Sequence, residues 1–150
     1  SNYLQQDADL DGYEIEFGNT MDLGSGELTM SFGRDVISGT FSSGGNIPRL
    51  NPARNIFKLK YSQDDMTLGL NFKDVEKQND IAVNETLTAG YQMLNAKLSR
   101  TIDLGSQGKL TLSLFGNNML DEIARNHSSF VKNEVPLPGR NYGLRFNLNF

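Results

Sequence analysis

The sequence predicts an all-β protein, an antiparallel up-and-down meander of about seven strands. Three observations support this prediction. Apolar residues recur at every second position in run after run, whereas the spacing of an amphipathic helix is almost absent. The 15 glycines against 4 prolines suit a chain rich in turns. Gly-, Asp-, Ser- and Asn-containing segments separate the runs, and no low-complexity linker interrupts them, so we expect one domain over residues 1–150.

Strict alternation places the apolar residues of each predicted strand on one face of the sheet. In chain order, the runs and their apolar residues are 12–17 (Tyr13, Ile15, Phe17), 27–40 (Leu28, Met30, Phe32), 55–61 (Phe57, Leu59, Tyr61), 66–73 (Met66, Leu68, Leu70, Phe72), 88–102 (Leu94, Ala96, Leu98), 109–117 (Leu110, Leu112, Leu114) and 141–150 (Tyr142, Leu144, Phe146, Leu148, Phe150). The fifth run is the least regular, because Tyr91 and Met93 fall on its other face.

The connections between these runs alternate in length. Short turns at 22–27, 62–65 and 103–108 alternate with longer segments at 41–54, 74–87 and 120–140. Every short turn therefore falls on the same side of the sheet as Phe150, and every long segment falls on the opposite side. Short turns at one end and long loops at the other are typical of up-and-down barrels in the outer membrane.

Composition excludes several classes of protein. The net charge of -4 and the pI near 4.9 argue against a nucleic-acid binder, which needs a basic surface. The absence of cysteine excludes disulfides, thiolate metal sites and a thiol nucleophile. No stretch approaches the roughly 18 apolar residues of a spanning helix, and the first residues lack the features of a signal peptide. If the protein is exported, we expect these residues to be mature sequence or a piece of a longer chain.

Two environments explain the apolar faces, a soluble core and a lipid bilayer. In a soluble sandwich or small barrel, one face of the sheet packs on the core and the other face is exposed to water. Three observations favour lipid. The runs reach roughly 9–11 residues, the length of a tilted membrane strand. Aromatic residues fall near the ends of the runs, as an interfacial girdle requires: Tyr13, Phe17, Phe32, Tyr61, Phe72, Tyr142 and Phe150. The polar faces carry charges that suit a watery lumen: Glu14, Glu16, Lys58, Lys60, Lys73, Lys97 and Arg145.

The last third of the chain, residues 112–150, closely resembles the C-terminal end of TonB-dependent outer-membrane receptors. Three features carry the resemblance: the step Asn-Asn-Met-Leu-Asp-Glu at 117–122, the Pro-Gly-Arg at 138–140 ahead of the last strand, and the terminal Phe150. Three more segments are similar to the family, the first two to its zinc-responsive branch: 124–141, 47–55 and 84–99.

This resemblance implies a transmembrane barrel of about 22 strands, filled by an N-terminal plug, in the outer membrane of a Gram-negative bacterium. It implies import of a scarce metal or metal chelate, zinc or a siderophore-type ligand, with energy from TonB. The chain would be the C-terminal part of that barrel, without the plug and the N-terminal strands. Its partners would be outer-membrane lipid, the barrel-assembly machinery, the rest of the barrel and plug, and TonB through the missing plug. Because an isolated piece leaves strand edges unpaired, we expect it to self-associate. The alternative is a self-contained soluble β-sheet domain used for adhesion or scaffolding.

No enzymatic site and no cofactor are predicted. The single histidine, His127, has no nucleophile in a recognisable setting, and no Gly-rich phosphate loop leads from a strand into a helix. His127 shares a long loop with Asp121 and Glu122, and imidazole with carboxylates suits Zn²⁺. One histidine and two carboxylates make an incomplete metal set. The alternative is that His127 stabilises the loop by hydrogen bonds.

Two further groups of residues have candidate roles. Four arginines in or beside the long loops could attract an anionic metal chelate to the mouth of a barrel, or could simply rigidify and solvate the loops: Arg49, Arg54, Arg125 and Arg140. The closing strand resembles the C-terminal signal read by the barrel-assembly machinery, through Asn141, Gly143, Phe146, Leu148 and Phe150. The alternative for this strand is an ordinary amphipathic edge strand.

Overall fold

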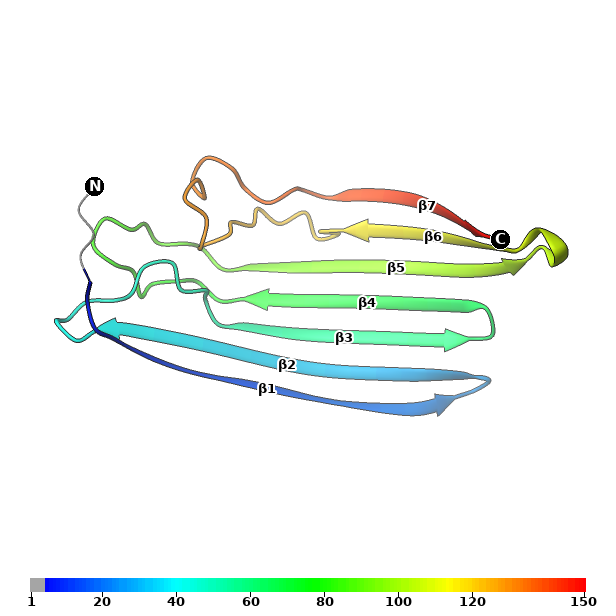
Figure 1. The fold of residues 1–150 in the computed structure, drawn as a ribbon, viewed down its shortest axis with the longest axis horizontal. Coiled ribbons are helices and arrows are strands. Elements are labelled where there is room, and N and C mark those ends of the chain that lie inside the picture. The colour runs from blue at the N-terminus through cyan, green and yellow to red at the C-terminus, as the bar shows by residue number, and fades with distance from the viewer. Residues whose placement is uncertain (1–4) are drawn as a thin grey trace.

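A computed structural model describes residues 5–150, which form one seven-stranded antiparallel sheet whose strand order follows the chain (Figure 1). The strands are β1 (Ala8–Leu23), β2 (Gly26–Phe41), β3 (Arg54–Gln63), β4 (Met66–Val75), β5 (Tyr91–Asp103), β6 (Lys109–Asn117) and β7 (Asn141–Asn149). The predicted fold class is confirmed. The one helix in these residues is the 3-10 turn η1 (Gly105–Gln107), and no helix of the described part is long and apolar enough to cross a membrane.

The connections divide cleanly between the two ends of the sheet. Two-residue turns join β1 to β2 and β3 to β4, and η1 lies in the connection from β5 to β6. Gly24 and Asp64 open the two tight turns with φ of 63° and 48°, as the favoured hairpin turns require. The long loops 42–53, 76–90 and 118–140 all lie at the opposite end, away from the C-terminus (Figure 1). The predicted alternation of short and long connections is therefore confirmed.

The first hairpin is longer than its sequence pattern predicts. β1 and β2 each have 16 residues, and β2 pairs with β3 only up to Asp35. Among the strands, residues 36–41 pair only with β1, so this hairpin extends about 20 Å beyond the rest of the sheet, and Thr40 forms an isolated bridge with Asn46 of the next loop. The loop 42–53 folds back against the extension, where a Cβ on Gly39 would overlap the side chains of Ile47 and Leu50. The fifth strand is shorter than predicted, since Thr88 pairs with Gln78 inside a loop instead.

The pairing register gathers the apolar side chains of all seven strands on one side of the sheet, here called the apolar face. Phe17, Phe32, Phe57 and Phe72 lie directly opposite one another in one row across β1–β4. Their ring centroids are 5.3, 4.7 and 6.3 Å apart along the row. The row continues through Leu94 of β5. Aromatic rings in such cross-strand pairs contribute contact energy beyond their burial.

This row corrects the predicted aromatic girdle. Phe17, Phe32 and Phe72 lie inside their strands, whereas Tyr61 and Tyr142 lie near strand ends, and Phe150 directly follows β7. Alternation identifies the face that a residue occupies, but its height along the sheet depends on the register with neighbouring strands. The long β1 and β2 place Phe17 and Phe32 at mid-strand.

The opposite side of the sheet, here called the polar face, carries charges of both signs. Glu14, Glu16 and Asp35 occupy it on β1 and β2, and basic residues occupy it on β3–β5 and β7: Arg54, Lys58, Lys60, Lys73, Lys97 and Arg145. No second layer formed by residues 5–150 covers either face. Among residues 5–150, Val75 and Ala124 are the only buried hydrophobic residues, so the described sheet has no hydrophobic core. Phe146 of the apolar face is 65% exposed.

Candidate functional site

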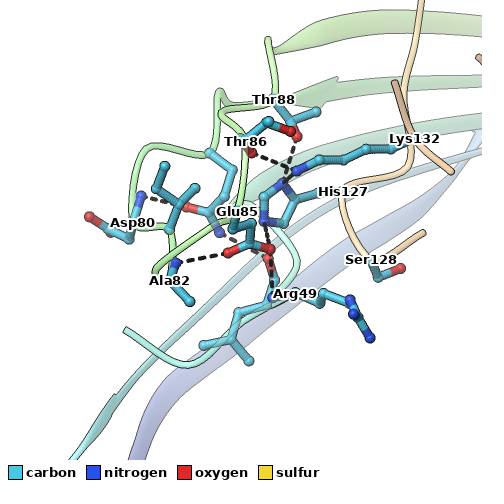
Figure 2. Close-up of polar contacts among 12 residues, drawn as sticks. Arg49, Asp80, Ala82, Glu85, Thr86, Thr88, His127, Ser128 and Lys132 are labelled. Carbon is cyan, nitrogen blue, oxygen red and sulfur yellow. Dashed lines mark hydrogen bonds and ion pairs between the residues drawn. The ribbon is translucent and has the colours of Figure 1, made fainter. Parts of the chain in front are cut away.

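The long-loop end of the sheet contains a buried polar cluster centred on Glu85 (Figure 2). The Glu85 carboxylate accepts a hydrogen bond from the backbone N–H of Ala82 at 2.9 Å and another from that of Arg49 at 2.9 Å. Ala82 belongs to the same loop, whereas Arg49 belongs to the loop 42–53, so one carboxylate joins two loops. Two further bonds join the same pair of loops, from the side chain of Asn46 to the Ile81 carbonyl and from that of Gln78 to the Leu50 carbonyl.

His127 brings the third loop, 118–140, to this cluster. Its side chain is fully buried, with Nδ1 2.6 Å from the Thr88 hydroxyl and 3.1 Å from the Lys132 ammonium. An ammonium can only donate, so Nδ1 accepts, and the proton of the neutral ring lies on Nε2. Nε2 is 3.2 Å from a Glu85 oxygen, but the alignment is too poor for a hydrogen bond, and Nε2 has no other partner in the described residues.

Lys132 completes the connection between the loops. Its ammonium donates to the Thr86 carbonyl at 2.6 Å as well as to His127, and the Asn133 amide donates to the Thr86 hydroxyl at 3.0 Å. We call Glu85, Thr88, His127 and Lys132 the loop clasp. Figure 2 shows these four side chains converging from the loops 76–90 and 118–140. The clasp holds loops that are about 40 residues apart in sequence in one arrangement.

The surroundings shift the protonation of three clasp residues. Burial, reinforced by the Lys132 charge, lowers the pKa of His127, so the ring is neutral at pH 7. Burial also lowers the pKa of Lys132. Burial alone would raise the pKa of Glu85, but the hydrogen bonds from Ala82 and Arg49 and the neighbouring His127 and Lys132 outweigh it, and the net pKa is lowered. An ionised Glu85 beside a neutral His127 is the expected state.

The predicted metal set is not brought together. The Asp121 carboxylate accepts from the backbone of Arg140 at 3.1 Å and lies 3.6 Å from its guanidinium. The backbone of Glu122 is held by the Asn118 side chain, and His127 faces Glu85 instead of either predicted partner. Within residues 5–150, no three His, Cys, Asp or Glu residues are grouped in a way that could hold a metal ion. His127 makes hydrogen bonds with Thr88 and Lys132, which is the kind of contact that the loop-stabilising alternative requires.

The four predicted arginines have different surroundings. Arg54 begins β3 and pairs with Asp35 at 2.6 Å, while Arg140 pairs with Asp121 as described. The Arg49 guanidinium lies 3.3 Å from the centroid of the Phe130 ring. Arg125 donates through Nη1 to the carbonyls of Lys132 and Asn133 at 2.7 and 3.0 Å. Of the four, Arg54 and Arg125 line one cavity together.

The residues of the predicted assembly signal lie on β7, an edge strand, and just beyond it. Asn141 and Gly143 are on the polar face, Phe146 and Leu148 are on the apolar face, and Phe150 follows the strand fully exposed. Packing explains why residue 143 is glycine, because a Cβ at this position would overlap the Phe115 ring on the neighbouring strand. Asn141 accepts a hydrogen bond from the Asn117 amide at 3.0 Å. A signalling role for these residues stays a prediction.

Comparisons with known proteins identify a structural neighbour. No protein-family model matches the sequence, and a comparison with curated proteins gives no significant match. A solved structure described as the copper transporter OprC is similar to 97% of this chain, with a TM-score of 0.78 and 23% sequence identity. The match spans 24% of the transporter chain, so this chain corresponds to about a quarter of that protein. At this identity the similarity establishes a common fold.

Proposed function

We propose that this chain forms part of the wall of an outer-membrane transport barrel, of the TonB-dependent receptor type, that imports a metal or metal chelate. The observation that carries the proposal is the bare apolar face. Leaving a large apolar side chain in water instead of burying it costs about 1.5–3 kcal/mol, and this face exposes such residues on all seven strands. Lipid removes this cost. Strands of 9 to 16 residues are long enough to cross a bilayer.

The polar face and the sheet edges support the same proposal. Charges on β1–β5 and β7 suit a wet lumen, and lipid would penalise them. β1 and β7 are open edges of the sheet, which a barrel closes by pairing with further strands. In this proposal residues 1–150 are the C-terminal part of a longer barrel, and the plug and TonB-contacting segment lie elsewhere in the full chain. Outer-membrane lipid and the barrel-assembly machinery are its proposed partners, and the isolated piece self-associates. The barrel is a transporter and not an enzyme.

The nature of the cargo is proposed at two levels. The structural similarity to a copper transporter supports a metal as the transported species. Zinc and a ferric siderophore are the finer alternatives, and zinc rests on the sequence resemblance of residues 47–55 and 124–141 alone.

The test uses the full-length protein in its native bacterium. We expect the protein in the outer-membrane fraction, and we expect deletion of its gene to reduce uptake of one of copper, zinc or a ferric chelate when that metal is scarce. Complementation restores uptake, and a strain lacking TonB matches the deletion. Unchanged uptake of all three metals, or a protein found outside the outer membrane, contradicts the proposal. A folded, monodisperse protein in buffer without detergent supports the soluble adhesion or scaffold domain instead.

A further inference from the structure

A cavity of about 300 Å³ lies where the loop 118–140 meets the polar face. The sheet contributes Arg54, Lys73 and Tyr91, and the loop contributes Arg125 and Asn126. Three of these five side chains are cationic, and none of the residues that line the cavity is acidic. The cavity is therefore a concentration of positive charge in a protein whose net charge is -4.

Two of the three charges have no carboxylate partner. Arg54 is paired with Asp35 at 2.6 Å, so its charge is largely balanced. Lys73 and Arg125 form no ion pair with any residue between 5 and 150. Both side chains are half-buried, so each charge has lost part of its hydration, and an anion in the cavity would replace that loss. A wider hollow on the polar face also contains Lys58, Lys97 and Arg145, but these are exposed to solvent, which screens them.

The cavity also offers hydrogen-bond donors that the described residues leave unused. Arg125 uses Nη1 for two backbone carbonyls, and its Nε and Nη2 have no recorded partner among residues 5–150. The side-chain oxygen of Asn126 accepts hydrogen bonds from the backbone N–H and the hydroxyl of Ser128. The NH₂ group of Asn126 has no partner among residues 5–150. Guanidinium, ammonium and amide donors are the groups that bind carboxylate and phosphate oxygens.

From this geometry we infer that the cavity bounded by Lys73, Arg125 and Asn126 is a binding site for a small multivalent oxyanion, carrying carboxylate or phosphate groups. Its volume suits a ligand of about the size of citrate. Because Lys73 is on β4 and Arg125 is in the loop 118–140, a bound anion joins the loop to the sheet. His127 belongs both to the wall of this cavity and to the loop clasp, so the anion stabilises the clasp as well. The inference rests on the proposed function in one respect, because that function places the cavity at the mouth of a barrel.

The test is calorimetric titration of the purified full-length protein in detergent, at low ionic strength, with citrate and with inorganic phosphate as separate probes. Sodium chloride of equal ionic strength is the blank. We expect Lys73→Gln and Arg125→Gln each to weaken binding about tenfold or more, since each removes a charge-assisted contact. Lys58→Gln is the matched control, with the same charge change on the same face, and it should bind like the wild type. Lys73→Arg keeps the charge and should retain binding.

The outcomes separate the alternatives. Binding of citrate alone or of phosphate alone identifies which oxyanion chemistry the site takes. Absence of binding for both probes beyond the chloride blank overturns the inference. Equal affinity in the wild type, Lys73→Gln and Arg125→Gln also overturns it, because the anion would then bind elsewhere. The titration measures binding and does not depend on transport. A protein that binds the anion but lies outside the outer membrane would therefore contradict the proposed function and leave this inference standing.

Discussion

The strands and the long-loop end follow opposite rules of burial. On the strands, apolar side chains such as Phe17 and Phe146 are exposed by 63% and 65%. At the loop end, polar side chains such as His127, Lys132 and Asn118 are buried. A soluble domain buries the first kind and exposes the second. In the proposed barrel, the strands would be stabilised by their backbone ladder together with surrounding lipid, whereas the loops have directed hydrogen bonds of their own.

The largest effect is expected from a charged residue introduced on the apolar face. Leu70 lies near the middle of β4, opposite Leu59 and Ala96, and Leu70→Arg places a charge where the proposal has lipid. We expect the free energy of unfolding of the full-length protein in lipid vesicles to fall by about 2–4 kcal/mol. Urea titration measures it. Asn71→Arg is the control, since the neighbouring residue points to the polar face and should change stability little. Equal losses in the two variants would remove the distinction between the faces.

A smaller effect, confined to the loops, comes from Asn118. Its amide donates to the carbonyls of Glu122 and Pro138 and accepts from the Glu122 N–H, and its φ of 48° suits asparagine better than alanine. We expect Asn118→Ala to lower the opening free energy of residues 118–140 by about 2–3 kcal/mol. Hydrogen exchange of these amides measures it.

The matched control for Asn118 is its neighbour Asn117. The Asn117 side chain makes one exposed bond, to Asn141, so Asn117→Ala should cost under about 1 kcal/mol. Exchange in β1–β4 should stay at the wild-type rate in both variants. Faster exchange throughout the sheet after Asn118→Ala would show that strands and loops form one cooperative unit, contrary to the comparison above.

The same contrast explains what the sequence could predict. Alternation is a local pattern, so the seven strands, their faces and the phase of their turns followed from it, with β6 placed at 109–117 as observed. Register is not local. The aromatic row of Phe17 and Phe32 was therefore misplaced to the strand ends, and the extension at 36–41 was missed.

The loop site depends even more on distant residues. His127, Asp121 and Glu122 were grouped because they are close in sequence, yet the partners of His127 in the other loop are Glu85 and Thr88, about 40 residues away. No spacing in the chain indicates that pairing. Arg125 was a candidate for anion attraction from its charge alone. Its proximity to Lys73 required the folded loop, since one residue follows β6 and the other lies on β4.

The smallest effect is the pH dependence of the loop clasp. The pKa of His127 is lowered in the folded clasp from an ordinary value of 6.5, so the open loops bind a proton more readily than the closed ones. The part of the clasp stability that depends on His127 is therefore complete above about pH 6.5 and falls as the pH drops from there toward the folded pKa. The lowered pKa of Glu85 adds a second loss below its ordinary value of 4.5. The lowered pKa of Lys132 affects the clasp only at alkaline pH, where clasp stability rises as the pH increases toward 10.5.

Hydrogen exchange at residues 84–88 and 126–133, corrected for the intrinsic exchange rate at each pH, measures this dependence. Between about pH 7.5 and 5.5 we expect the opening free energy to fall in the wild type and to stay level in His127→Leu, which has no titrating ring. The strands carry no such histidine within the described residues, so their exchange should be flat over the same range. A wild-type slope that persists in His127→Leu would assign the titration to another group. A slope shared by strands and loops would mean that acid loosens the whole sheet, and the two regions would then be stabilised together and not separately.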